Sequence, residues 1–142
     1  PQLDELRGLV TEVGADVEFA GFRSGEALHA AIRSARALVL PSECYENAPM
    51  SILEAYALGK PVIGARVGGI PELIEERTTG VSFESGNVES LTAALAELAS
   101  LADEHLAAMG RAARKHVEHG FSATTYRERM LALYREVGVP CA

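Results

Sequence analysis

Short apolar runs alternate along the chain with longer segments in which apolar residues recur at helical spacing. Four short runs predict β-strands, at residues 17–20, 37–40, 62–65 and 81–83. Helices are predicted over residues 3–13, 26–34, 48–59, 70–76, 88–101, 103–119 and 123–137. Ser24 or Gly25 is expected to begin the second of these, and Ser122 to cap the last. Strands that alternate with helices predict a parallel, doubly wound α/β sheet.

The helix predicted within residues 48–59 contains a single charged residue, Glu54. Its neighbours on nearly every face are apolar, which is typical of a buried helix. A buried carboxylate is costly unless it is paired or hydrogen-bonded, and hydroxyl groups of a sugar or ribose are good donors to it. The alternative is a carboxylate that reaches solvent at one end of the helix.

The start of the same helix offers a place for an anion. Pro49 suits a first helical turn, which would leave the backbone N–H groups of Met50, Ser51 and Ile52 without helical acceptors. Such N–H groups, together with the positive end of the helix dipole, favour phosphate. Glu46 lies in the preceding loop, eight residues before Glu54. A phosphate site flanked by two carboxylates matches the chemistry of a nucleoside diphosphate sugar.

The stretch from Glu46 to Ile74 resembles the donor-site signature of the retaining glycosyltransferases of family 4, which share the two-domain fold called GT-B. The two glutamates are separated by seven residues, and residues 54–74 read EAYALGKPVIGARVGGIPELI. The resemblance implies a Rossmann-like donor-binding domain, the C-terminal half of a GT-B fold. Residues 1–142 are then expected to form part of that domain, with C-terminal helices over residues 88–137.

The resemblance also implies roles for the two glutamates. Glu54 would accept hydrogen bonds from the ribose hydroxyls. Glu46 would hold a donor-sugar hydroxyl and is the candidate catalytic residue, whereas the neighbouring Glu43 would belong to the scaffold. An ordinary acidic loop is the alternative explanation for Glu46.

The residues between the glutamates depart from the commoner family form. Asn47-Ala48-Pro49-Met50 stands where Gly-Phe-Gly-Leu is usual, although a Glu-Asn-x-Pro variant is familiar. Asn47, Pro49, Met50 and Ser51 are still expected to line the donor site, because phosphate would be bound by backbone N–H groups. The side chain of Met50 could serve core packing alone.

Two glycine-containing turns are further candidates. In the family, the turn that matches Gly21-Phe22-Arg23 lies beside the nucleobase, so these residues are candidate base contacts through their backbone; an ordinary strand-to-helix turn is equally compatible. Gly68 and Gly69 would allow backbone to approach a ligand closely, or would form a tight turn before Pro71.

The family's domain has six strands in the order 3-2-1-4-5-6, and the four predicted strands match strands 3 to 6. The first two strands have no counterpart in residues 1–142. Because this leaves exposed sheet edges, we expect an N-terminally truncated fragment whose first predicted strand is rearranged or completed by another chain. A homo-oligomer formed through the exposed sheet edges is a possible result.

The composition of the chain disfavours several classes of function. The 142 residues carry a net charge of −7, which disfavours nucleic acid as a partner. No apolar run reaches the ~18 residues of a membrane span, and no signal peptide opens the chain. Cys44 and Cys141 lack metal-ligand spacing and are too few for a disulfide framework, so a cytoplasmic setting is expected. Peripheral membrane association of the parent enzyme would depend on the missing domain.

The family resemblance implies the donor-binding part of a retaining hexosyltransferase that moves a sugar from a nucleoside diphosphate sugar to a hydroxyl acceptor. The family works without an essential metal, so no cofactor is expected. The acceptor would bind the missing N-terminal domain, and an Arg and a Lys that the family uses would precede the first predicted strand. The isolated chain is therefore expected to bind nucleotide weakly without transferring sugar. The alternative is a non-catalytic nucleotide-binding or oligomerisation fragment.

Overall fold

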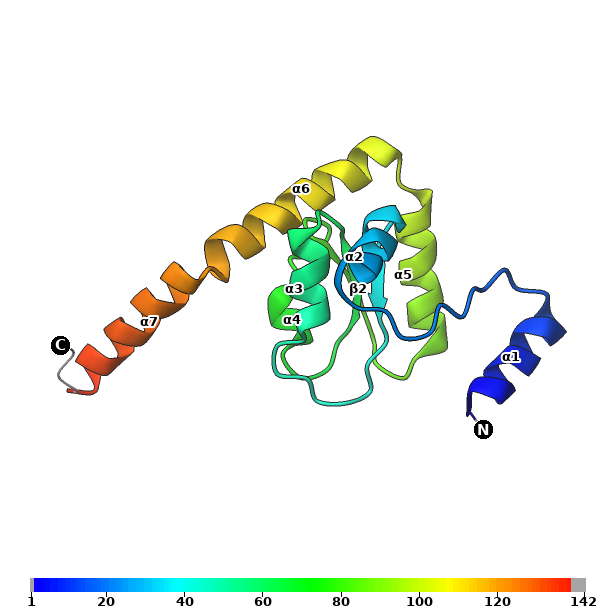
Figure 1. The fold of residues 1–142 in the computed structure, drawn as a ribbon, viewed down its shortest axis with the longest axis horizontal. Helices are drawn as coiled ribbons and strands as arrows, with labels where there is room; N and C mark the ends of the chain where they lie inside the picture. Colours follow the sequence, from blue (N-terminus) through cyan, green and yellow to red (C-terminus); the bar gives the residue numbers. More distant parts are fainter. Residues whose placement is uncertain (1, 139–142) are drawn as a thin grey trace.

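The computed structural model describes residues 2–138, and within them a parallel sheet lies between two layers of helices (Figure 1). Its strands run in the order β1-β2-β3 and comprise Leu38–Leu40, Val62–Ala65 and Gly80–Phe83. The helices are α1 (Gln2–Val13), α2 (Gly25–Ser34), α3 (Met50–Ala57), α4 (Ile70–Leu73), α5 (Val88–Ser100), α6 (Asp103–Gly120) and α7 (Ala123–Glu136). The predicted α/β class with a parallel sheet is confirmed.

One apolar core lies between the sheet and helices α2, α3 and α4. Its buried members come from all of these elements and include Ile32, Ile52, Val62, Ile70 and Leu73. Tyr56 on α3 is fully buried in this core. Its phenol oxygen lies 3.2 Å from the Leu73 carbonyl oxygen and 2.9 Å from Thr79 Oγ1. Burial raises the pKa of Tyr56 to about 12.

A second core lies on the opposite face of the sheet, beneath α5. Residues Ile63, Ala65, Val81 and Phe83 point into it, as expected from the alternation of side chains along a strand. Helix α6 contributes to both cores, through Leu106 and Met109 on this side and Ala113 on the other. It can cross close to the start of β2 because Gly110 meets Gly59 backbone to backbone.

Side-chain caps explain two helix boundaries that the sequence predicts. The Asn87 side chain accepts a hydrogen bond from the Ser90 backbone N–H at the start of α5. The Ser122 hydroxyl does the same for Thr125 at the start of α7. Ser24 occupies the N-cap position of α2 without such a bond. These boundaries confirm the predicted helices.

The strand predicted at residues 17–20 is wrong, because these residues form no regular secondary structure. Val17 and Phe19 are 50% and 36% exposed. A strand is stable only when a neighbour accepts and donates its backbone hydrogen bonds. In the family's strand order, the only neighbour of this strand is one that has no counterpart in residues 1–142.

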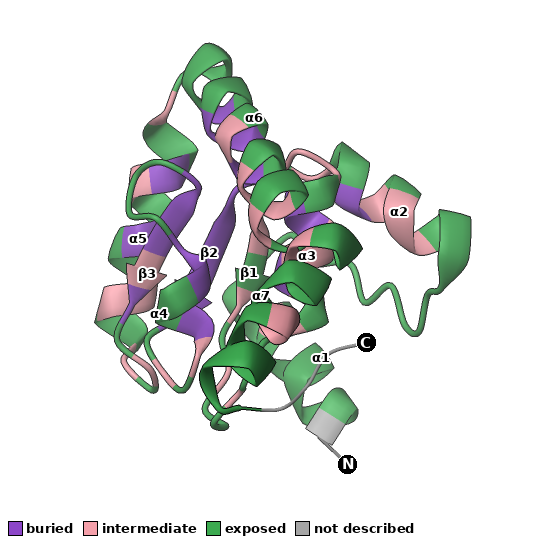
Figure 2. Cartoon of the chain, turned by 90° about the vertical axis from the view of Figure 1, so that its left-hand side faces the viewer, coloured by how far each residue is buried: buried purple, intermediate pink, exposed green. Residues whose placement is uncertain are grey.

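Two further predictions need correction. Helix α4 ends at Leu73 rather than at residue 76, because the Thr79 hydroxyl and the Glu75 backbone bind each other in the turn that follows. Strand β1 is not fully buried: Val39 is 37% exposed. Figure 2 shows β2 buried along its length and β1 only partly so. Val39 lies on the face of the sheet that packs beneath α5, where the helix layer covers β2 and β3 but ends before β1.

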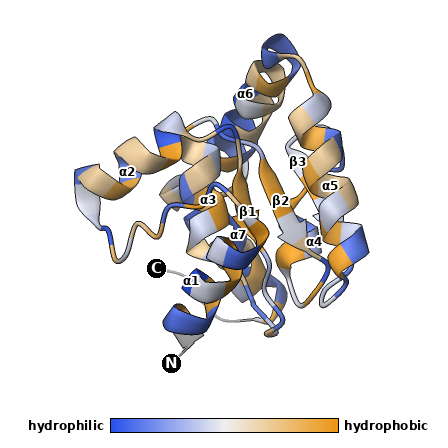
Figure 3. Ribbon diagram, turned by 90° about the vertical axis from the view of Figure 1, so that its right-hand side faces the viewer, coloured by the Kyte–Doolittle hydropathy of each residue, from blue (hydrophilic) through white to orange (hydrophobic). Residues whose placement is uncertain are grey.

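The first and last helices lie at opposite ends of the molecule, away from the sheet (Figure 1). Helix α1 exposes a stripe of apolar residues comprising Leu3, Leu6, Leu9 and Val13. No residue of α7 is buried. Figure 3 shows by contrast that β2 lies within the apolar interior. Among residues 2–138, no helix has both the length and the apolar character needed to cross a membrane.

Candidate functional site

The loops that follow the three strands meet at the carboxyl edge of the sheet, where open α/β sheets bind their ligands. Two hydrogen bonds join them. Ser85 Oγ, after β3, donates to the Ser42 carbonyl oxygen after β1 at 3.0 Å. The Gly69 N–H, after β2, donates to the Glu46 carbonyl oxygen at 2.7 Å. The loop that carries Glu46 is therefore held by the loops that follow the other two strands.

Gly68 and Gly69 are required by the close approach of this loop. A Cβ atom on Gly69 would lie 2.0 Å from the Asn47 carbonyl oxygen, and one on Gly68 would lie 2.3 Å from that of Glu46. Gly68 also has a φ of +56°, which favours glycine. The backbone that these glycines admit thus belongs to residues 46–47, which neither of the two sequence-based explanations anticipated.

Ser42 orients the carboxylate of Glu46, a role that the sequence analysis missed. The Ser42 hydroxyl lies 3.4 Å from Glu46 Oε1 and 3.3 Å from the Cys44 carbonyl oxygen, and it accepts a hydrogen bond from the Cys44 N–H at 3.2 Å. Glu46 itself is half-buried. The available signal was the position of Ser42, in the loop that begins with Pro41 after β1, at the ligand-binding edge.

Glu54 lies in the second turn of α3 and is half-buried. Ile52, Ala55 and Tyr56 around it are buried, whereas Met50 is 64% exposed, so α3 is buried on one side only. Within residues 2–138, no donor lies within hydrogen-bonding distance of the Glu54 carboxylate. Its oxygens are therefore free to accept hydrogen bonds from a ligand.

The start of α3 differs slightly from the prediction. Pro49 is the N-cap residue, with φ −65° and ψ 119°, rather than part of the first helical turn. The Ile52 N–H donates to the Pro49 carbonyl oxygen at 3.1 Å, so it is already satisfied. Among the described residues, the N–H groups of Met50 and Ser51 have no acceptor. Two donors, rather than three, remain for an anion at this helix start.

The structure does not bring the turn at residues 21–23 into this arrangement. Phe22 is 96% exposed. Arg23 bonds within its own segment, to Glu18 Oε1 at 3.1 Å and to the Ala20 carbonyl oxygen at 3.5 Å. Gly21 has a φ of +66° and forms the bend between them. Base contacts by these residues remain a prediction.

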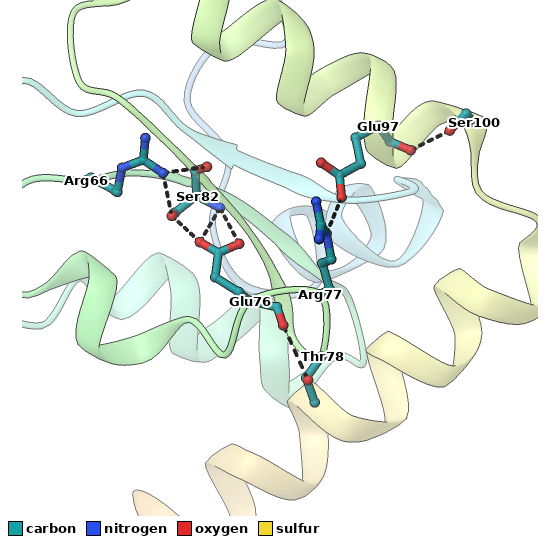
Figure 4. A network of polar contacts seen from close by, with 7 residues as sticks. All are labelled: Arg66, Glu76, Arg77, Thr78, Ser82, Glu97 and Ser100. Atoms are coloured by element: carbon teal, nitrogen blue, oxygen red, sulfur yellow. Dashed lines mark hydrogen bonds and ion pairs between the residues drawn. The ribbon is translucent and has the colours of Figure 1, made fainter.

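Arg66 follows β2 at the same edge, but its side chain turns toward β3 (Figure 4). Its Nη1 lies 3.3 Å from both the carbonyl oxygen and the hydroxyl oxygen of Ser82. The Glu76 carboxylate accepts from the Ser82 N–H at 3.0 Å and also contacts its hydroxyl. These contacts hold the Arg66 side chain against β3.

The carboxyl edge thus offers two half-buried carboxylates, Glu46 and Glu54, and two free backbone donors at a helix start. Carboxylates accept hydrogen bonds from hydroxyl groups, and helix-start N–H groups bind phosphate. Among the residues that the structure describes, no cluster of three or more His, Cys, Asp or Glu side chains could hold a metal ion; Cys141 lies outside them. The arrangement suits a ligand that carries both phosphate and hydroxyl groups.

Comparisons with known proteins extend this picture. Residues 1–116 match the family model described as "Glycosyl transferases group 1". The chain is 34% identical over 133 residues to the D-inositol 3-phosphate glycosyltransferase of Saccharomonospora viridis, covering 92% of this chain and 30% of that protein. It is 33% identical over 133 residues to the GDP-mannose-dependent monoacylated alpha-(1-6)-phosphatidylinositol monomannoside mannosyltransferase of Corynebacterium glutamicum, covering 88% and 34%.

A solved structure shows the same fold. Sucrose-phosphate synthase from Thermosynechococcus elongatus is similar with a TM-score of 0.79 and 27% identity, over 94% of this chain and 34% of that one. This likeness confirms the predicted Rossmann-like domain of a GT-B fold. The chain spans about a third of the length of these curated relatives.

Proposed function

The chain belongs to the glycosyl transferases group 1 family, and from that premise we propose that it is the donor-binding part of a retaining hexosyltransferase. Its substrate would be a nucleoside diphosphate sugar. One observation carries the proposal: the Glu54 carboxylate is half-buried without a donor among residues 2–138, one turn from the unsatisfied N–H groups at the start of α3. The name of the Corynebacterium glutamicum relative, GDP-mannose-dependent, supports a donor of this class.

Each group at the carboxyl edge has a part in binding this donor. The N–H groups of Met50 and Ser51 bind the diphosphate, and Glu54 accepts hydrogen bonds from the ribose hydroxyls. Glu46, oriented by Ser42, holds a hydroxyl of the donor sugar. As the bond to the leaving diphosphate breaks, negative charge grows on its oxygens, and donors already aimed at them stabilise the transition state. The residues at 21–23 would contact the base.

Transfer needs groups that these residues do not supply. The acceptor site, and the cations that the family uses beside the diphosphate, would come from the remainder of a longer enzyme, of which this chain would span about a third. We therefore expect the isolated chain to bind nucleotide and to show no turnover. A coupled assay of nucleoside diphosphate release tests this, and measurable turnover by the pure chain would contradict it.

Calorimetric titration with UDP, GDP and ADP tests the binding proposal directly. We expect saturable binding of one of them. Glu54→Gln should weaken it about tenfold, equivalent to about 1.4 kcal/mol, because charged hydrogen bonds to the ribose become neutral ones.

Glu89→Gln is the matched control for this titration. Glu89 is exposed at the start of α5, outside the proposed site, and takes no part in the hydrogen bonds that join the carboxyl-edge loops. Its substitution makes the same change of charge and should leave the affinity unchanged. An equal loss in both variants would indicate a general charge effect and would contradict the role of Glu54. Failure of all three nucleotides to bind would contradict the proposal for this chain.

A further inference from the structure

A hollow separate from the carboxyl edge lies where α6 ends and α7 begins, against the turn that precedes β3. Its volume is about 480 Å³. We call it the basic hollow and define it by its polar lining residues Glu75, Thr78, Lys115, His116, His119 and Arg129. None of them belongs to the loops that hold Glu46 or to helix α3.

The two cationic side chains of the basic hollow, Lys115 and Arg129, form no ion pair in the part of the chain that the structure describes. Arg129 Nη1 donates to the Gly120 carbonyl oxygen at 3.2 Å, which fixes the guanidinium at the rim. A guanidinium has five N–H donors, so this bond leaves several for a ligand.

The one carboxylate in the lining is already engaged. Glu75 Oε1 lies 2.9 Å from His116 Nδ1. The His116 ring packs against Tyr56 and Phe121, at centroid distances of 6.1 and 5.7 Å, so its position is fixed. Its Nε2 atom is buried without a hydrogen-bond partner in the structure. The hollow thus presents two cations without carboxylate partners, beside a fixed imidazole ring and a carboxylate that already contacts that ring.

Two cations without an ion-pair partner line this hollow, whereas the chain as a whole carries a net charge of −7. An acidic surface repels anions generally, so a local basic hollow is where an anion would be held. We propose that the basic hollow binds a phosphate group. Arg and Lys donors match phosphate oxygens in charge and geometry, and the hollow is large enough to admit part of the molecule that carries the phosphate. That molecule is either a soluble phosphorylated compound or an anionic phospholipid.

Titration of the isotope-labelled chain with inorganic phosphate, followed by amide NMR shifts, tests the proposal. We expect saturable shifts at residues 115–120 and at Arg129. Lys115→Gln and Arg129→Gln should each weaken binding about tenfold. Shifts at Met50 and Ser51 report the proposed donor site separately, so failure of one site is distinguishable from failure of the other.

Sedimentation with vesicles separates the two sources of phosphate. Vesicles of phosphatidylglycerol should retain the chain, and those of phosphatidylcholine should not, if a lipid headgroup is the ligand; shifts with phosphate but no vesicle binding identify a soluble ligand. Arg111→Gln is the control, because Arg111 is exposed on α6 outside the hollow. Unchanged amide signals of the sheet residues verify that each variant is folded.

The proposal would be overturned by three results. One is that phosphate causes no shifts at residues 115–120 and that the chain also fails to bind anionic vesicles. Another is a set of shifts confined to Met50 and Ser51. The third is an equal loss of affinity in Arg111→Gln, which would show a general effect of charge rather than a site.

Discussion

At the scale of single residues, Ser42 decides how the Glu46 carboxylate is presented. The hydroxyl contacts Glu46 Oε1 and both the N–H and the carbonyl oxygen of Cys44. Ser42→Ala removes this support without changing charge, so the carboxylate should sample more orientations and hold a donor-sugar hydroxyl less well. We expect the affinity for the nucleotide sugar to fall about fivefold, because a hydrogen bond of this kind contributes about 1 kcal/mol.

The contrast with the free nucleotide distinguishes positioning from a general structural loss. In the proposed site, Glu46 contacts only the sugar, so Ser42→Ala should leave the affinity for the matching nucleoside diphosphate unchanged. Calorimetric titration of the variant with both ligands measures the difference. Equal weakening for the two ligands would show that Ser42 supports the whole loop rather than the Glu46 carboxylate.

Tyr56 should make stability depend on alkaline pH. Burial raises its pKa from the ordinary value of 10.0 to about 12. Below pH 10 the phenol is protonated in the folded and unfolded states, so its contribution is complete. Between pH 10 and 12 the unfolded phenol loses its proton first, so the free energy of unfolding should fall by up to about 2.7 kcal/mol.

Tyr56→Phe isolates this effect from other groups that titrate at high pH. The variant should be less stable by about 1 to 2 kcal/mol at pH 8, because Thr79 and the Leu73 carbonyl lose a partner in the core. Between pH 10 and pH 12 the difference should close and then reverse, because only the parent chain loses the stability linked to the Tyr56 proton. Urea unfolding at each pH measures it, and a gap that stays constant would rule out a raised pKa of Tyr56.

At the scale of elements, two glycines of α6 should respond in opposite ways to alanine. A Cβ atom on Gly110 would lie 2.0 Å from the Gly59 carbonyl oxygen, whereas nothing lies within 4 Å of one on Gly120. The Gly59 carbonyl belongs to the backbone and cannot rotate away as a side chain can. Gly110→Ala must therefore push α6 away from α3, and we expect it to lower the free energy of unfolding by about 3 kcal/mol. Gly120→Ala should be neutral or stabilise by up to about 1 kcal/mol, as alanine favours helix.

Urea unfolding at neutral pH compares these two variants with the parent chain. The pair is matched in chemistry and helix, so the difference in unfolding free energy reports the close contact alone. Equal stability of Gly110→Ala and Gly120→Ala would mean that α6 does not cross Gly59 as closely as the structure describes.

Elements determined by local signals could be predicted from the sequence. The caps at Asn87 and Ser122 mark helix starts whatever the remainder of the chain does, and the apolar run at residues 62–65 is a strand because neighbours pair with both of its edges. Residues 17–20 carry apolar side chains at Val17 and Phe19 but form no strand, because a strand also needs a partner for its backbone hydrogen bonds.

In the candidate site too, some residues are recognisable from the local sequence, whereas the roles of others depend on contacts with distant segments. Glu46, Glu54 and the start of α3 could be identified because their chemistry and spacing lie within one stretch of sequence. The roles of Ser42 and of Gly68 and Gly69 could not, because each depends on a contact with another segment or across a loop. The exposure of Val39 likewise depends on where the layer of helices ends.

At the scale of the whole molecule, the two edges of the sheet differ in how they are covered. The outer edge of β3 is protected where the Glu76 carboxylate accepts from the Ser82 N–H. Strand β1 forms the other edge, and no strand of the described chain pairs with its outer side. Next to that edge, Val39 is exposed on a face that no helix covers. An uncovered edge beside apolar surface favours pairing with another chain.

We therefore predict that the isolated chain self-associates through β1, and that Val39→Lys prevents it. A lysine on an edge strand opposes pairing because its charge would be placed against the partner strand. Val88→Lys is the matched control, since Val88 is 73% exposed on α5, far from β1 in the sheet order. Sedimentation velocity over a hundredfold range of concentration should show a dimer for the parent chain and for Val88→Lys, and a monomer for Val39→Lys. If the parent chain is a monomer throughout, the exposed edge is tolerated without a partner; if both lysine variants dissociate the dimer equally, the contact does not involve β1.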